Sequence, residues 1–136
     1  MNRPANPFQF EAAHTQEVGG ESILDSDTFS ALWELAGEDD PELVADLVAL
    51  FLADSAGRVR EIRANRSATD FDQVGQAAHA LKSSSANVGA LPFSRICAEL
   101  EEVTRVGEIG NEGITELIDR TLLMYGEVCV ALGHST

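Results

Sequence analysis

The chain has 136 residues, 44% of them hydrophobic, which suffices for one core and is too short for two ordinary domains. Its 9 basic and 23 acidic residues give a formal charge of −14, so most of the surface would repel a nucleic acid. No apolar run approaches the roughly 20 residues that cross a bilayer, and no basic segment precedes an apolar one as in a secretory leader. We therefore expect one cytoplasmic domain that binds neither nucleic acid nor membranes.

Residues 1–21 are rich in Asn, Pro, Gln, Glu and Gly and show no sustained hydrophobic period. Because such a segment buries little apolar surface, we expect a disordered tail or linker, followed by a helical domain over residues 22–133. His14 lies in this tail and His134 in the C-terminal Gly-His-Ser-Thr. Both are interpreted as solvent-exposed histidines without a role.

From Ile23 onward the apolar residues recur at helical spacing. A short first helix is predicted from about Ser26 to a stop at Gly37. Its apolar stripe comprises Phe29, Leu32, Trp33 and Leu35. Because Phe29 and Trp33 need burial, this helix is expected to close one end of a larger bundle.

Asp40 and Pro41 form a strong start signal for a second, long helix, with Asp40 as the cap and Pro41 at the first helical position. This helix is predicted to run to about Asn65. Its apolar residues are Leu43, Leu47, Phe51, Val59 and Ile62. Gly57 inside it costs about 1 kcal/mol relative to Ala, which predicts a bend or a looser turn there.

Three further helices follow. The third is expected to begin at residues 69–72, which resemble a capping box with Asp in place of Glu, and to end near Gly89. Pro92 begins a predicted fourth helix that ends at Gly107, and Asn111 caps a predicted fifth. No run alternates between polar and apolar residues around hairpin turns, so a β-sheet is improbable. Long amphipathic helices joined by loops of about three to six residues predict an all-α antiparallel four-helix bundle, with the short first helix capping one end.

The two cysteines, Cys97 and Cys129, are far apart and each lies within an apolar stretch. Neither belongs to a Cys-x-x-Cys or a Cys/His spacing that would bind a metal. Both are therefore interpreted as core residues, since a free cysteine packs as a small hydrophobic side chain.

His79 has distinctive surroundings, because the chain's only lysine, Lys82, follows it by three residues. Residues three apart share a helix face, so the imidazole and the ammonium are expected to lie on one patch of surface. The buried stripe of the third helix is predicted to comprise Phe71, Val74, Ala78, Leu81, Ser85 and Val88. At about 100° per residue, His79 points roughly 130° away from this stripe and is expected to face solvent.

Small residues surround His79 on this face, among them Gly75, Ser83 and Ala86, together with Gln76 as a further candidate site residue. A glycine inside a helix costs about 1 kcal/mol relative to Ala. Such a cost is explained if another surface must approach the imidazole closely. Residues 57–82 also carry five basic and three acidic side chains, and this basic island suits an anionic group or an acidic partner unless it is a plain solvated face.

The spacing alone leaves several interpretations of His79 open, including an ordinary surface residue. A metal ligand is disfavoured because no His or Cys lies three or four residues further on. A hydrolase is disfavoured because the serines at 83–85 lie within a predicted helix and not on a glycine-rich elbow. The chain also lacks the Gly-x-x-x-x-Gly-Lys and Gly-x-Gly-x-x-Gly runs of nucleotide sites.

A resemblance to a known family rests on the run from His79 to Ala90, which reads His-Ala-Leu-Lys-Ser-Ser-Ser-Ala-Asn-Val-Gly-Ala. It resembles the pattern His-x-Leu-Lys-Gly-Ser-Ser/Ala, followed by Gly, of the histidine-containing phosphotransfer (HPt) domain of multistep two-component signalling. The resemblance extends from Ile23 to Leu132. It includes the Gly-Glu-Asp-Asp-Pro-Glu-Leu run before the long helix, Ala-Ala-His, and Cys-Ala-Glu-Leu-Glu on the next helix.

The resemblance implies that His79 is phosphorylated on its outward ring nitrogen by a receiver-domain aspartyl phosphate and passes the phosphoryl group to another receiver. Lys82 would offset the phosphate charge, and Glu101 would accept a hydrogen bond from the other ring nitrogen. Arg105, one turn further on, is a candidate second positive charge. Ser83 replaces the family's usual Gly, so its hydroxyl either contacts the phosphate or narrows access to it.

The implied partners are receiver domains of response regulators or a hybrid histidine kinase. The receiver would supply Mg²⁺, so this chain is expected to bind no cofactor and no ATP and to act as a monomeric relay protein, not as an enzyme. The alternative is a helical adaptor that docks on a receiver or kinase through the same face without carrying phosphate. A metal-binding bundle is the third hypothesis.

Overall fold

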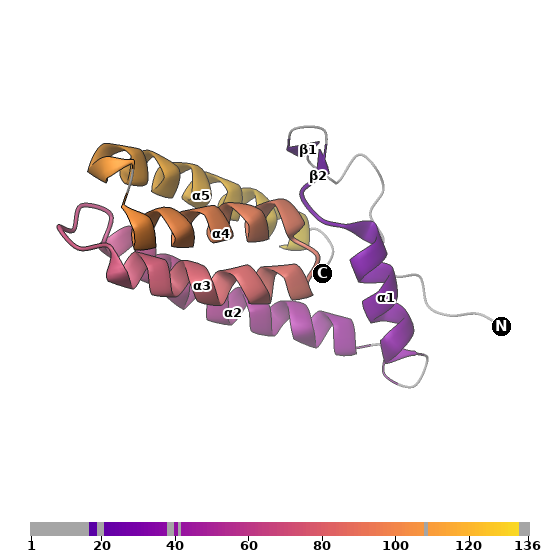
Figure 1. Cartoon of the computed structure of the whole chain (residues 1–136). Helices are drawn as coiled ribbons and strands as arrows, with labels where there is room; N and C mark the ends of the chain where they lie inside the picture. Colours follow the sequence, from indigo (N-terminus) through magenta and orange to yellow (C-terminus); the bar gives the residue numbers. More distant parts are fainter. Residues whose placement is uncertain (1–16, 19–20, 38–39, 41, 108, 134–136) are drawn as a thin grey trace.

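A computed structural model describes residues 17–18, 21–37, 40, 42–107 and 109–133. Its elements are β1 (Glu17–Val18), β2 (Glu21–Ser22), α1 (Ser26–Ala36), α2 (Leu43–Ala64), α3 (Asp72–Asn87), α4 (Leu91–Val106) and α5 (Gly110–Gly133). In Figure 1, α2 to α5 form the predicted antiparallel four-helix bundle, and α1 lies across the end where α3 connects to α4. None of the described helices combines the length and the apolar composition of a bilayer-spanning segment.

α1 begins and ends as the sequence predicts. The Asp25 side chain accepts a hydrogen bond from the Thr28 amide at 2.9 Å, and Gly37 ends the helix with a φ of 66°. Phe29 and Trp33 are buried, so this helix does close the bundle, whereas the prediction for Leu35 is wrong because its side chain is 77% exposed. The Asp25 amide also donates to the Gly89 carbonyl at 2.7 Å and joins α1 to the α3–α4 connection.

The starts of three helices differ from the predicted caps. α2 begins at Leu43, and Asp40 contributes its backbone carbonyl to the Leu43 amide at 3.2 Å, while Pro41 lies outside the described residues. At α3 the Asp70 carboxylate accepts from the Asp72 amide at 2.9 Å, so an Asx turn replaces the predicted capping box. α5 begins at Gly110, which places the predicted cap, Asn111, inside the first turn.

The core lies between the bundle helices. The predicted stripe of α3 is buried throughout, which confirms the outward direction of the opposite face. α2 continues through Gly57, and it buries Val44 and Val48 more completely than the predicted Leu43 and Leu47. Cys97 is fully buried but Cys129 is only half-buried. The prediction of a core residue is therefore confirmed for Cys97 and holds only in part for Cys129.

A small antiparallel pair precedes α1. β1 and β2 have two residues each, and Glu17 pairs with Ser22 while Val18 pairs with Glu21. The pair lies at the end of the segment for which a disordered tail or linker is predicted, and most of that segment falls outside the described residues. Strands this short add no layer to the fold. The predictions for His14 and His134 fall outside the described residues.

Candidate functional site

His79 lies in the middle of α3 on the face opposite the buried stripe. Its imidazole side chain is 66% exposed. The exposure follows from sequence, because Ala78 and Leu81 point into the core and leave His79 on the outer side of the same turns. The ring is therefore accessible to another molecule.

Glu101 on α4 connects the imidazole to the ammonium group of Lys82. One carboxylate oxygen, Oε2, lies 2.7 Å from His79 Nδ1, and the other, Oε1, accepts a hydrogen bond from Lys82 Nζ at 2.8 Å. His79 and Lys82 come from adjacent turns of α3, so a single carboxylate from the neighbouring helix reaches both. These three residues are called the His79–Glu101–Lys82 cluster below.

The cluster keeps Glu101 ionised. The hydrogen bond from Lys82 lowers the pKa of the Glu101 carboxyl below its usual value, partial burial opposes this, and the bond to His79 adds to the lowering. The Glu101 side chain is 26% exposed, so solvent screens these interactions incompletely. An ionised carboxylate has acceptors and no donor.

The ionised carboxylate determines which ring nitrogen of His79 carries the hydrogen. Because Glu101 has no hydrogen to donate, the Nδ1 atom must donate at 2.7 Å. In a neutral imidazole with hydrogen on Nδ1, the lone pair in the ring plane belongs to Nε2. The arrangement therefore leaves the Nε2 lone pair on the side of the ring away from Glu101.

An open hollow lies beside the ring. It is lined by Asp72, Gly75, Gln76, His79, Glu101, Thr104 and Arg105. Gln76 is exposed at its edge, which places this candidate residue next to the imidazole. Arg105 also borders the hollow, but one of its terminal nitrogens lies 2.6 Å from each carboxylate oxygen of Glu102. The Arg105 guanidinium is thus paired with Glu102 on the same helix and not with the His79–Glu101–Lys82 cluster.

Ser83 is exposed one turn beyond His79 and is not among the residues that line the hollow. The next two serines bond to their own helix. Ser84 Oγ donates to the Ala80 carbonyl at 3.2 Å, and Ser85 Oγ donates to the Leu81 carbonyl. These bonds explain how polar side chains fit inside α3, and they give the serines no role as nucleophiles.

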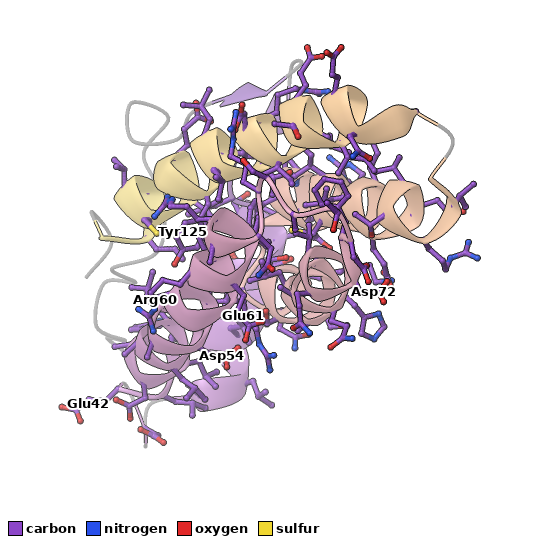
Figure 2. All side chains as sticks on the ribbon, turned by 90° about the vertical axis from the view of Figure 1, so that its left-hand side faces the viewer. Glu42, Asp54, Arg60, Glu61, Asp72 and Tyr125 are labelled. Carbon is purple, nitrogen blue, oxygen red and sulfur yellow. The ribbon has the colours of Figure 1, made fainter. Side chains whose placement is uncertain are left out.

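The basic island predicted over residues 57–82 does not surround His79. None of its arginines lines the hollow, and Figure 2 shows Arg60 on α2 well apart from Asp72, which borders it. Arg66 forms an ion pair of 2.6 Å with Asp119 on α5. From this window only Lys82 contributes a positive charge to the cluster. In the described part of the chain, no three His, Cys, Asp or Glu side chains gather as a metal ion would require.

Comparison with known proteins identifies relatives of this chain. The family model described as "Hpt domain" matches residues 46–125, which include the whole cluster. A histidine-containing phosphotransfer protein 2 of Arabidopsis thaliana is 32% identical over 92 residues, covering 65% of this chain and 58% of that protein. A histidine-containing phosphotransfer protein 1 of Oryza sativa subsp. japonica is 34% identical over 82 residues, covering 59% of this chain and 55% of the relative.

The fold has a solved counterpart as well. The crystal structure of histidine-containing phosphotransfer protein B from Pseudomonas aeruginosa matches with a TM-score of 0.62 at 30% identity, covering 82% of this chain and 90% of that one. The chain spans little more than half the length of the plant relatives, 58% and 55%, but nearly all of the bacterial structure. With more than half of its residues matched by the family model, the chain belongs to the Hpt domain family.

Proposed function

We propose that the chain is a phosphorelay intermediate that accepts a phosphoryl group on His79 from a receiver-domain aspartyl phosphate and passes it to another receiver. The observation that carries this proposal is the 2.7 Å contact of His79 Nδ1 with Glu101, which leaves Nε2 as the nucleophilic atom of an exposed ring. Membership in the Hpt domain family supports the same role.

The transfer step balances without a base in this chain. The Nε2 lone pair attacks phosphorus, the Nε2–P bond forms, and the P–O bond to the aspartate breaks with its electron pair leaving on the carboxylate. Both ring nitrogens are then substituted, so the imidazole gains positive charge. Glu101, which accepts from Nδ1, faces that charge and stabilises it.

Lys82 is proposed to offset the charge of the incoming phosphoryl group. Its ammonium has three donors and uses one toward Glu101 at 2.8 Å, so others are available to phosphoryl oxygens. Lys82 and Glu101 together carry no net charge. A dianionic group at Nε2 therefore meets a nearly balanced site and not a repulsive acidic surface, despite the formal charge of −14 on the whole chain. Gln76, Ser83 and Arg105 are proposed to contribute secondary contacts around the phosphoryl group.

The receiver is proposed to supply Mg²⁺ and the electrostatic machinery of the transition state, because phosphoryl transfer depends mainly on positioning and charge stabilisation. The chain is then a substrate-like carrier that binds no ATP and has no turnover of its own. The proposed partners are receiver domains of response regulators or of a hybrid histidine kinase. A monomer in the cytoplasm fits this role.

The test is incubation of the full chain with a phosphorylated receiver, followed by measurement of acid-labile phosphate on the chain. His79→Gln is expected to remain unlabelled. His14→Gln and His134→Gln replace the other histidines and serve as matched controls that label normally. Labelling of His79→Gln at the wild-type rate would contradict the site, whereas receiver binding without any labelling of the wild type would favour the adaptor hypothesis.

A further inference from the structure

Gly75 lies one turn before His79 on α3 and faces Thr104 on α4. A Cβ atom on Gly75 would lie 2.6 Å from Thr104 Oγ1 and 3.5 Å from Thr104 Cβ. The first distance is shorter than non-bonded carbon and oxygen atoms adopt. The absence of a side chain at position 75 is thus what allows the Thr104 hydroxyl to occupy its place.

The turn of α4 that contacts Gly75 is the turn that carries the Glu101 carboxylate. Thr104 Oγ1 donates a hydrogen bond to the Glu101 carbonyl at 2.9 Å. Thr104 is β-branched and has few alternative rotamers in a helix. A Cβ atom at position 75 must therefore displace this turn or break the bond from Thr104 to Glu101.

A second contact fixes the two helices on the other side of the cluster. Ser94 Oγ, near the start of α4, donates to the Lys82 carbonyl on α3 at 2.7 Å. Along the antiparallel helix pair, the Gly75–Thr104 contact and the Ser94–Lys82 bond therefore lie on either side of the hydrogen bonds that Glu101 accepts from His79 and Lys82. Together they set the register and the separation at which one carboxylate reaches both His79 and Lys82.

We propose that Gly75 and Ser94 are positioning residues that hold Glu101 between the imidazole and the ammonium. The proposal rests on the function assigned above to His79 and adds what aligns its nucleophile. A hydrogen bond weakens steeply when its length or angle changes, so a small displacement of α4 changes the hydrogen position on the ring. Displacements near 1 Å reduce the rates of positioned reactions by about 100-fold.

Gly75→Ala is the direct test, with two readouts. We expect phosphoryl transfer from a receiver to fall about tenfold or more. We also expect the ¹⁵N spectrum of the neutral His79 ring to show less hydrogen on Nδ1 than in the wild type. Helix propensity alone predicts that Gly75→Ala stabilises α3, since Ala is the better helix former, so it does not account for a slower transfer.

Two companion variants isolate the contact. Gly57→Ala also replaces a glycine inside a helix, but its Cβ would meet only an Arg60 guanidinium nitrogen at 3.8 Å, an ordinary contact. It is expected to transfer phosphate normally. The double variant Gly75→Ala/Thr104→Ala removes the clashing hydroxyl and is expected to restore both the rate and the ring spectrum.

The outcomes separate this proposal from its rivals. Gly75 also borders the hollow beside His79, so a small residue there would equally admit a partner's side chain. If the double variant stays slow, access and not helix positioning is the role of Gly75, and the proposal is overturned. An unchanged rate and ring spectrum in Gly75→Ala overturns it as well.

Ser94→Ala keeps the proposal testable if Gly75→Ala fails to fold, because it removes the other contact without adding atoms. It is expected to shift the ring spectrum in the same direction, and an unchanged spectrum counts against the proposal. A wild-type chain that no receiver phosphorylates would contradict the proposed function alone, since the ring spectra still report where Glu101 lies.

Discussion

The Lys82 ammonium donates to the Glu101 carboxylate at 2.8 Å across the contact between α3 and α4. The chain's only lysine is thus already compensated before any phosphate arrives. Because His79 occupies the other oxygen of the same carboxylate, a change at either charged residue alters the environment of the ring.

Removal of the ammonium by Lys82→Ala is expected to slow phosphoryl transfer about tenfold. One elementary charge a few ångströms from the phosphoryl group contributes about 1–4 kcal/mol near a protein surface. The free energy of unfolding is expected to change by less than about 1 kcal/mol, because the side chain is partly exposed. Arg66→Ala removes a cation from the ion pair with Asp119, which joins the connection after α2 to α5, and serves as control. Equal rates in wild type and Lys82→Ala would show that the ammonium is dispensable.

Glu101→Gln is expected to change how the stability of the chain depends on acid. The folded-state pKa of Glu101 lies below its usual value of 4.5, chiefly through the bond from Lys82. The ionised cluster therefore stabilises the fold above the unfolded-state pKa, and this contribution is lost as the pH falls through the folded-state pKa. Urea unfolding at neutral pH and well below pH 4.5 should show that wild type loses more stability than Glu101→Gln. If wild type and Glu101→Gln lose the same free energy of unfolding in acid, groups other than Glu101 cause the acid sensitivity.

The outward position of His79 could be predicted from sequence because it depends on one helix. A buried stripe with helical spacing determines the opposite face whatever the neighbouring helices are. The position of His79 and Lys82 on one face of the helix follows in the same way. Hydrophobic periodicity does not give the register between two helices. The position of Glu101 beside the ring was therefore predictable only from the family resemblance. Neither the periodicity nor the resemblance indicates that Glu101 also accepts a hydrogen bond from Lys82.

The errors at helix starts have a common physical cause. Asp40, Thr69 and Asn111 are all residue types that cap helices, but the orphan amides of the first turn can be satisfied by several neighbouring groups. At α3, the Asp70 carboxylate accepts from the Asp72 amide and so replaces the predicted cap. The prediction for Leu35 is wrong because, at about 100° per residue, Leu35 lies roughly 160° around the helix from the buried Trp33 and so faces away from the bundle.

The single tyrosine, Tyr125 on α5, is expected to titrate abnormally. Burial raises its pKa from 10.0 to about 12, although the bond of 2.8 Å to Ser55 on α2 acts in the opposite direction. Figure 2 shows Tyr125 on the α5 ribbon near α2. Because the folded-state pKa is raised, its contribution to stability is complete below pH 10 and is lost as the pH rises toward 12.

Phenolate absorbance measures this directly, since the chain has one tyrosine. The native protein should ionise near pH 12, or unfold first, whereas the protein in urea should ionise near 10. Ser55→Ala removes the group that lowers the pKa of Tyr125, so its transition should occur at still higher pH. A native transition near 10 would show that the phenol is solvated.

The two cysteines are expected to differ in reactivity toward an alkylating agent. Burial raises the pKa of Cys97 to about 12, and it also raises that of the half-buried Cys129. The thiolate is the reactive form, so both should react slowly, and Cys129 should react first because reagent reaches it without unfolding. Mass spectrometry over time, with Cys129→Ser as control, resolves the order. Simultaneous labelling would indicate that α4 opens as readily as the end of α5.

Gly89→Ala is expected to loosen α1 from the bundle. Gly89 has a φ of 80°, and a Cβ there would lie 3.1 Å from Thr28 Cβ and 3.2 Å from the Asp25 carbonyl oxygen. Gly37 has a φ of 66° and would gain no such contact, so Gly37→Ala measures the backbone strain alone, about 1–2 kcal/mol. Urea unfolding should show that Gly89→Ala loses at least about 1 kcal/mol more, because the bond from the Asp25 amide to the Gly89 carbonyl is also disturbed. Equal losses in the two variants would mean that α1 is held by Phe29 and Trp33 and not by its junction with the α3–α4 connection.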